Sequence, residues 1–177
     1  MVARMRWPTI ICVCLELLGM AAVRLEACDA AVPHHIRIED CPLATLVAKG
    51  LEQSPTLRRV VDRVAELHGI VYVVTGVYAS LRRTELRGTL SPRVAVAGET
   101  CVMRISLKRQ YGPEGVATLA HELRHAIEVL EVPDARTERT IVRLFERIGS
   151  AVGDELYETQ AALTTEAAVL RELRPTR

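Results

Sequence analysis

Hydrophobic positions between residues 54 and 74 follow first the period of a helix and then that of a strand. Ser54 and Pro55 suit an N-cap and a first helical turn. Apolar residues then recur at helical spacing, at Leu57, Val60, Val61, Val64 and Leu67. Gly69 suits the position just past a helix end, and the β-branched run Ile70 to Val74 predicts a buried strand. We therefore expect one helix followed by one strand.

The stretch from Leu86 to Lys108 predicts strands joined by turns. Val94 to Val96 and Val102 to Leu107 flank Gly98-Glu99, a pair that suits a hairpin turn. The second run has the period of a sheet with one buried face, because Met103, Ile105 and Leu107 alternate with Val102, Arg104 and Ser106. We expect a small, mostly antiparallel sheet.

The strongest helical pattern in the chain follows this sheet. It opens at Pro113, ends before Pro133, and has a continuous apolar stripe of Val116, Leu119, Ala120, Leu123, Ala126, Ile127 and Leu130. Two more helices are predicted, one from about Ala135 to Ile148 and one from an Asp154 cap to about Leu173. The chain therefore predicts an α+β fold with one N-terminal helix, a small sheet and three later helices.

The composition fits one packed domain. The chain has 177 residues, of which 49% are hydrophobic and 25% are charged, so a buried core is expected and disorder is not. The net charge of +1 provides no large field of one sign, and we expect no nucleic-acid partner. We divide the chain into residues 1–30, a lead-in over 31–53 that is extended up to about Asp40, and a folded domain over 54–177. The sequence leaves the oligomeric state open.

Residues 1–30 have the pattern of a signal peptide. Arg4 and Arg6 precede a mostly apolar run from Ile10 to Val23, and small residues follow at Ala27, Ala30 and Ala31. The run is short for a transmembrane helix. We therefore expect export to the periplasm or the extracellular space; the alternative is a misplaced start ahead of a cytoplasmic protein. Leu25 to Cys28 also resembles a lipoprotein cleavage box, so a lipid anchor on Cys28 is a second, less favoured alternative.

A mature chain without this signal keeps two cysteines, Cys41 and Cys101. In an oxidising compartment they can form one disulfide, and otherwise they are two buried thiols. Sequence separation does not fix the distance between two Cα atoms, so both alternatives stay open.

The segment His121-Glu122-Leu123-Arg124-His125 matches H-E-x-x-H on the strongest predicted helix. Residues four apart lie on one helix face, so the imidazoles of His121 and His125 can reach one metal ion. Glu122 is rotated by about 100° from His121, so it lies beside that ion. A zinc ion lowers the pKa of a bound water to about 7, and a neighbouring carboxylate can take its proton during attack on a carbonyl. The motif predicts a zinc hydrolase with Glu122 as general base.

A catalytic zinc usually has three protein ligands, and the motif supplies two of them. Glu128 lies two turns from His121 and is a poor common ligand. A carboxylate on a later helix is a better candidate. Glu158 at the start of the last predicted helix is the first choice and Glu146 the second, while Glu155 and Glu166 stay open.

The segment from Ala117 to Glu128 resembles the active helix of gluzincin-type metallopeptidases. Together with Tyr157-Glu158-Thr159 it also resembles a group of small exported bacterial proteins that have an A-H-E-L-x-H-A-x-E helix and a later aromatic-E-T segment. The resemblance implies a zincin-like metallohydrolase domain, zinc at His121 and His125, Glu122 as base and Glu158 as third ligand. It implies no particular substrate.

These observations predict an exported zinc peptidase that acts on a peptide or protein substrate. The alternative is a zinc-binding protein of the same fold without peptidase activity, and a third reading is a structural domain without metal. Within the first reading, we expect Val102 to Leu107 to form the sheet edge above the metal and to pair with an extended peptide.

Overall fold

The structure, a computed structural model, describes residues 30–76, 86–153 and 156–174. Its helices are α1 (Cys41–Gln53), α2 (Pro55–Glu66), α3 (Pro113–Leu130), α4 (Glu138–Ile148) and α5 (Gln160–Leu173). Its strands are β1 (Ile36–Ile38), β2 (Gly69–Thr75), β3 (Gly88–Leu90), β4 (Ala95–Ala97), β5 (Thr100–Leu107), β6 (Ser150–Gly153) and β7 (Leu156–Glu158). The predicted signal peptide and Cys28 lie outside the described residues, as do Asp154 and Glu155. None of the described helices is long and apolar enough to cross a membrane.

The main sheet is mixed and not mostly antiparallel, so that part of the sequence prediction was wrong. Its order is β1-β2-β5-β3, and β4 also pairs with β5. Strands β1, β2 and β5 run parallel, whereas β3 and β4 run antiparallel to β5. Strands β1 and β2 run parallel because the helices α1 and α2 between them carry the chain back to the end of the sheet at which β1 begins. The hairpin prediction is confirmed, since Gly98 adopts a positive φ of 61° in the turn between β4 and β5.

Two helices precede β2, where the sequence predicted one. Asp40 ends the extended part of the lead-in and caps α1, accepting a hydrogen bond from the backbone N–H of Leu43. Ser54 ends α1 and then caps α2. Because α1 buries Leu43 and Val47 in the main core, residues 41–53 belong to the folded domain and are not a lead-in.

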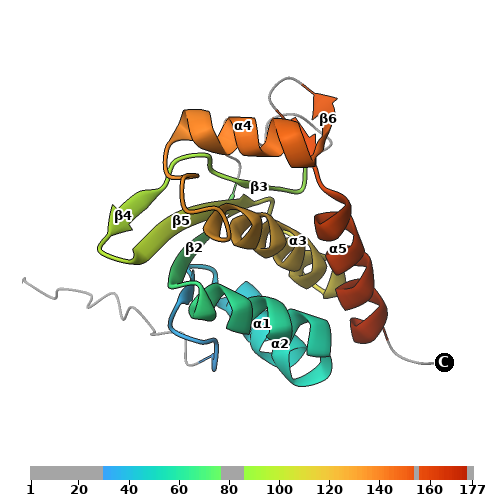
Figure 1. Ribbon diagram of the computed structural model, residues 1–177. Helices are drawn as coiled ribbons and strands as arrows, with labels where there is room; N and C mark the ends of the chain where they lie inside the picture. Colours follow the sequence, from blue (N-terminus) through green and yellow to red (C-terminus); the bar gives the residue numbers. More distant parts are fainter. Residues whose placement is uncertain (1–29, 77–85, 154–155, 175–177) are drawn as a thin grey trace, which may run out of the picture.

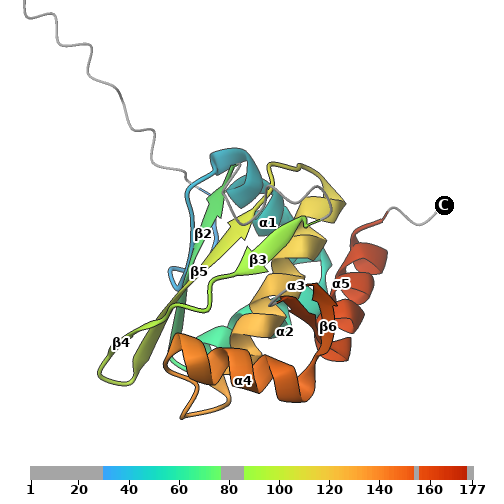
Figure 2. The same cartoon turned by 90° about the horizontal axis from the view of Figure 1, so that it is seen from above.

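Helix α3 lies at the centre of the molecule, between the sheet and the helices α1, α2 and α5 (Figure 1; Figure 2). The prediction of this helix is confirmed, with Gly112 before it and Pro133 beyond its end. Fifteen of its 18 residues are buried, and these include the polar residues His121, Glu122, His125 and Glu128. A buried polar side chain needs a partner inside the molecule, and this requirement applies to all four of these residues.

The chain after α3 differs from the prediction at one point. Helix α4 begins at Glu138 behind a Thr137 cap, close to the predicted position. The last helix begins later than expected, at Gln160 behind a Thr159 cap, and the antiparallel hairpin β6–β7 occupies the preceding segment. Glu158 therefore ends strand β7 and does not open the last helix.

Both described cysteines are free thiols, so the structure has no disulfide between Cys41 and Cys101. Cys101 is buried at the start of the central strand β5, and burial raises the pKa of its thiol. A buried neutral thiol behaves as a small apolar side chain, so the expectation of two buried thiols holds for Cys101, whereas Cys41 is a free thiol that is only half-buried.

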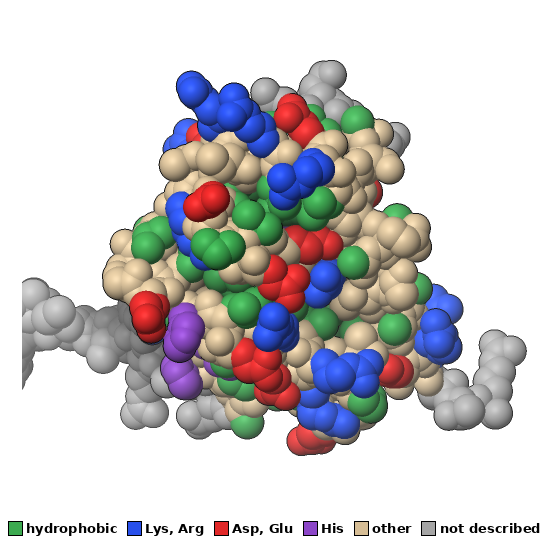
Figure 3. Space-filling model, in the orientation of Figure 1, with side chains coloured by type: hydrophobic (Ala, Val, Ile, Leu, Met, Phe, Trp, Pro, Cys, Tyr) green, Lys and Arg blue, Asp and Glu red, His purple; other side chains and the backbone are tan. Residues whose placement is uncertain are grey.

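The surface in Figure 3 carries basic and acidic side chains in alternation over the helices, without a field of one sign on that face. This distribution agrees with the net charge of +1. The absence of a nucleic-acid partner stays a prediction.

Glu172 on α5 ties the last helix to the start of α2, and this contact predicts a pH-dependent stability. Its carboxylate accepts hydrogen bonds from the hydroxyl of Ser54, from the Thr56 backbone N–H at 3.1 Å and from the Thr56 hydroxyl at 2.7 Å. Partial burial raises the pKa of Glu172, but these hydrogen bonds outweigh it and lower the pKa. Glu172→Gln should cost about 0.5–1 kcal/mol at pH 7.

The sign of the pH dependence follows from the lowered pKa. The contribution of Glu172 is complete above the unfolded pKa of about 4.3 and is lost as the pH falls through the folded value. Urea unfolding of the wild type and Glu172→Gln at pH 7 and at about pH 3.5 measures this difference. Exposed Glu52 provides the control, and Glu52→Gln should show no such pH-dependent difference. A Glu172→Gln deficit that persists unchanged in acid would contradict this account.

Candidate metal centre

Three side-chain atoms converge at the buried middle of α3. His121, His125 and Glu158 each offer one ligand atom, and these atoms lie within 4.8 Å of one another. The two histidine Nε2 atoms are 3.2 Å apart, and Oε2 of Glu158 lies 3.0 Å from Nε2 of His121 and 3.9 Å from Nε2 of His125. The i, i+4 spacing on α3 brings the imidazoles together, and strand β7 brings the carboxylate.

The spacing of these atoms fits a tetrahedral ion. Ligands at about 2.0–2.1 Å from a tetrahedral zinc are about 3.3–3.4 Å from each other. The three observed separations of 3.0, 3.2 and 3.9 Å surround that value. Oε2 of Glu158 is also buried without a well-aligned hydrogen bond within the described structure, and both imidazole Nε2 atoms lie near it. A cation satisfies such a group of donors, so the residues fit a bound metal ion.

Each imidazole has a second carboxylate on its far side. Oε2 of Glu128 lies 2.9 Å from Nδ1 of His125, and its other oxygen accepts a hydrogen bond of 2.7 Å from the Thr159 hydroxyl. Oε2 of Glu166 on α5 lies 3.1 Å from Nδ1 of His121. A carboxylate at Nδ1 keeps the proton on that nitrogen and leaves the Nε2 lone pair for a metal.

The positions of Glu128 and Glu166 can be compared with what the sequence predicted for them. Glu128 was rejected as a ligand, and the structure places it outside the ligand cluster. Glu166 was left open as a ligand, and the structure places it behind His121 instead. The signal for Glu128 was present in the sequence, because its i, i+3 spacing puts it beside His125. No local spacing relates Glu166 to His121, and only the packing of α5 on α3 brings them together.

The electrostatics of the cluster favour a positive charge at His121. Burial lowers the pKa of His121, but its contacts with Glu158 and Glu166 outweigh this and raise the pKa to about 10. The contact with His121 also lowers the pKa of Glu166. Two carboxylates thus compensate one positive charge at this position, which either a proton or a metal ion can supply.

Glu122 lies beside the cluster and not in it, as the helix geometry predicted. It is 5% exposed, and this burial raises the pKa of its carboxyl to about 7 although His121 and His125 act in the opposite direction. The backbone N–H of Leu90 on β3 hydrogen-bonds to it. Gly88 packs so closely that a Cβ there would lie 2.8 Å from Oε1 of Glu122, so a side chain at position 88 would displace the carboxylate.

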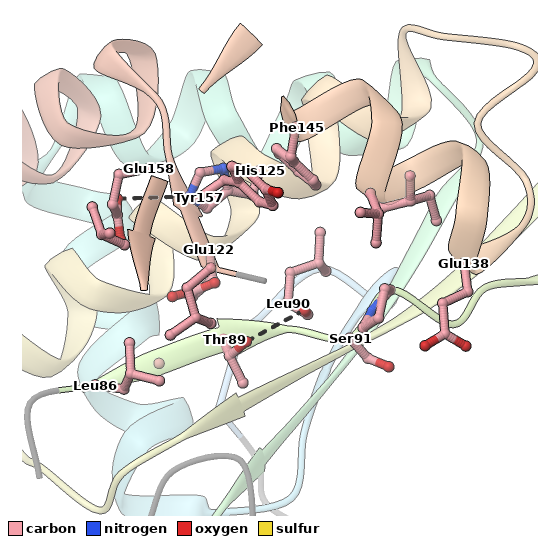
Figure 4. Close-up of a pocket in the computed structure, with 16 residues that line it drawn as sticks. Leu86, Thr89, Leu90, Ser91, Glu122, His125, Glu138, Phe145, Tyr157 and Glu158 are labelled. Atoms are coloured by element: carbon pink, nitrogen blue, oxygen red, sulfur yellow. Dashed lines mark hydrogen bonds and ion pairs between the residues drawn. The ribbon is translucent and has the colours of Figure 1, made fainter. Parts of the chain in front are cut away.

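A cavity of about 470 Å³ opens beside these groups (Figure 4). Glu122, His125 and Glu158 line it on the side of α3 and β7, Leu90 lines it on β3, and Phe145 lines it on α4. The cluster therefore faces a space that can hold a small ligand.

No protein-family model, curated protein or solved structure matches this chain. The α+β architecture is observed, whereas the zincin-like fold and the resemblance to gluzincins stay predictions.

Glu158 and Glu146, the two leading candidates for the third ligand, occupy different positions. Glu158 belongs to the cluster, whereas Glu146 is exposed on α4 and accepts a hydrogen bond of 3.5 Å from the Tyr157 hydroxyl. We therefore expect Glu158→Ala to weaken zinc affinity by at least about 100-fold, because losing a ligand should exceed the 10–100-fold loss typical of an outer partner.

Competition titrations with a chromogenic zinc chelator measure these affinities, and Glu146→Ala is the matched control. The control should keep the wild-type affinity. A normal affinity in Glu158→Ala together with a weakened one in Glu146→Ala would show that the third ligand is Glu146.

Proposed function

We propose that this chain is a zinc-dependent hydrolase and that its substrates are peptides. The main support for this proposal is that the ligand atoms of His121, His125 and Glu158 meet beside Glu122, which is buried and lines the same cavity. Two imidazoles and one carboxylate form a ligand set used by catalytic zinc in peptidases, and this set leaves one coordination position for water or substrate. Nitrogen-rich sites of this kind suit zinc better than calcium or magnesium, which prefer oxygen ligands.

The residues around the cluster supply the other parts of a hydrolytic reaction. A bound zinc ion would acidify a water molecule and polarise a substrate carbonyl. The carboxylate of Glu122 can accept a proton from that water and return it to the leaving amine. The Leu90 N–H and the close packing of Gly88 hold its carboxylate in place. Glu128 lies at hydrogen-bond distance from Nδ1 of His125, and Glu166 lies 3.1 Å from Nδ1 of His121, so both outer carboxylates leave the Nε2 atoms on the side of Glu158.

The sheet edge beside the site is β3 and not β5. The prediction that Val102 to Leu107 forms the edge was wrong, because β5 pairs with β2 on one side and with β3 and β4 on the other. Among the described strands, β3 has a partner only in β5. The Arg87 carbonyl accepts a hydrogen bond from the Lys108 N–H, and the Ser91 N–H donates one to the Arg104 carbonyl. Backbone groups of successive residues in a strand point to opposite sides, so those of Gly88 and Leu90 point away from β5. The Leu90 N–H already donates to Glu122, so an extended peptide can pair with the backbone of Gly88 and with the Leu90 carbonyl at this edge.

Hydrogen exchange tests this placement of the peptide. The zinc-loaded chain should show slower exchange of the Gly88 amide when a zinc-chelating peptide inhibitor is added, because a new main-chain hydrogen bond covers β3 there, whereas the Leu90 amide already donates to Glu122. The amides of Val102 to Leu107 provide an internal control and should be protected with or without inhibitor, since β5 already pairs on both sides. Unchanged exchange at β3 with a saturating inhibitor would contradict pairing at this edge.

A mixture of unstructured peptides tests the function itself. The full chain loaded with one equivalent of zinc should produce new peptide fragments, detected by mass spectrometry, and a chelator should stop their formation. Zinc binding without any fragments would favour the alternative of a zinc-binding protein without peptidase activity.

A further inference from the structure

We propose that the cavity beside the metal centre is a pocket for one large apolar side chain of the substrate, either aliphatic or aromatic. The inference rests on the proposed function and specifies its substrate class: peptides that carry such a side chain next to the bond that is cut.

The cavity has one polar wall and one apolar wall. The polar wall consists of Glu122, His125 and Glu158, so the space is continuous with the proposed site of reaction. The opposite wall comes from α4, from the β6–β7 hairpin and from β3, through Ile141, Val142, Phe145, Val152, Leu156 and Leu90. In Figure 4 the labelled apolar side chains adjoin the polar groups, with Phe145 close to His125 and Leu90 below them. An apolar wall that faces the reacting groups selects an apolar side chain, because such a side chain leaves water when it enters.

The packing around Phe145 gives this wall a defined position. Its ring lies edge-on to the imidazole of His125, with the ring centroids 5.3 Å apart and the planes at 87°. This is a favourable arrangement for two aromatic rings. The apolar lining from α4 therefore begins directly beside a proposed metal ligand.

The charges that line the cavity and its volume further limit which substrate side chains can enter it. The carboxylate of Glu138 lines the far end of the cavity, but the guanidinium of Arg93 lies 3.7 Å from it and compensates its charge. The remaining acidic groups, Glu122 and Glu158, belong to the polar wall, so among the described lining residues Glu138, paired with Arg93, is the one carboxylate on the far side. A volume of about 470 Å³ lies in the lower part of the range of about 300–1,000 Å³ for small-ligand pockets, which suits one or two side chains of an extended peptide.

Leu90 connects the pocket to the sheet edge. It belongs to β3 and also lines the cavity, and its backbone N–H hydrogen-bonds to Glu122. A peptide that pairs with β3 would place alternate side chains on the two faces of the sheet, so one of them would reach the pocket.

Binding of two zinc-chelating probes to the zinc-loaded full chain tests the proposal without requiring hydrolysis. The two probes are peptidyl hydroxamates with the same backbone, one with glycine and one with a benzyl side chain that can fill the pocket, and acetohydroxamate serves as a separate check of the metal site. Calorimetry should show that the benzyl probe binds about 10- to 100-fold more tightly, which corresponds to the burial of one aromatic side chain. An equivalent affinity for the two probes would overturn the proposal.

Filling the pocket gives the matched test. Val142→Trp should reduce the benzyl preference to less than about threefold. The new indole occupies the space in which the benzyl side chain would be buried, and that burial provides the gain of about 10- to 100-fold in affinity. Arg143→Trp adds the same side chain at an exposed neighbour outside the cavity wall and should keep the full preference. Affinity for acetohydroxamate should be the same in both variants, which shows that the metal site is intact. If Val142→Trp does not fold, Leu156→Trp fills the pocket from the hairpin instead.

The outcomes separate this inference from the proposed function. A strong benzyl preference that a pocket-filling variant removes, in a protein that cleaves no peptide, supports the pocket and contradicts the peptidase. Cleavage of peptides without regard to their apolar side chains, together with equal binding of the two probes, supports the peptidase and overturns the pocket. A benzyl preference that survives in the folded, zinc-loaded Val142→Trp and Leu156→Trp variants also overturns it.

Discussion

His121→Ala and His125→Ala are each expected to remove stoichiometric zinc binding, from about one ion per chain to none at micromolar protein concentration. Each variant deletes one of the three atoms that meet within 4.8 Å. The loss of affinity should exceed the 10–100-fold that is typical when an outer partner of a ligand is removed. Elemental analysis of the purified, dialysed chain measures the zinc content directly.

Three matched variants make this result specific. Glu128→Gln and Glu166→Gln alter only the outer carboxylates, and each should reduce zinc affinity by about 10–100-fold without abolishing binding. His34→Ala removes an exposed histidine and should leave the zinc content unchanged. Full zinc occupancy in the His121→Ala/His125→Ala double variant would show that the site lies elsewhere.

Glu122→Gln is expected to retain zinc and to lose about 10²–10⁴-fold in kcat, the contribution typical of a general acid or base. Glutamine has nearly the same shape but cannot accept and return a proton. Because Glu122 lies outside the cluster of three donors, zinc content should not change. Steady-state cleavage of a quenched fluorescent peptide, with zinc content measured on the same sample, tests both parts.

Glu114 provides the control for this substitution on the same helix. It is an exposed glutamate in the first turn of α3, and Glu114→Gln should keep both zinc and activity. If Glu122→Gln cleaved peptides at the wild-type rate, Glu122 would not be the base. Loss of zinc from Glu122→Gln would instead indicate that this carboxylate is a ligand.

The parts of this site that lie on one helix could be predicted from the sequence. The apolar period of α3 and the i, i+4 spacing of His121 and His125 are local properties of the chain, and helix geometry alone places Glu122 beside them. Glu158 was chosen as a carboxylate of a later element, and the structure brings it to the two histidines. Its element was assigned wrongly, because Thr159 and not Asp154 caps α5, and residues before Thr159 pair as a hairpin.

The parts that depend on long-range packing could not be predicted in the same way. Alternation along β5 showed that one face of the strand is buried, but it does not show which strands lie on either side. The strand was therefore mistaken for an edge, and the short β3 was not recognised as the edge beside the site. Helix α1 was missed although Asp40 and Pro42 form a start signal, because the segment was interpreted as a lead-in. Glu166 reaches His121 only through the docking of α5 on α3.

We infer that His121, His125 and Glu158 hold one zinc ion beside Glu122. The most direct measurement is a crystal structure of the zinc-loaded chain with anomalous diffraction data on both sides of the zinc absorption edge. We expect one strong anomalous peak at about 2.0–2.2 Å from Nε2 of both histidines and from a carboxylate oxygen of Glu158. A fully occupied zinc at other side chains, with these three donors paired only with one another, would contradict it.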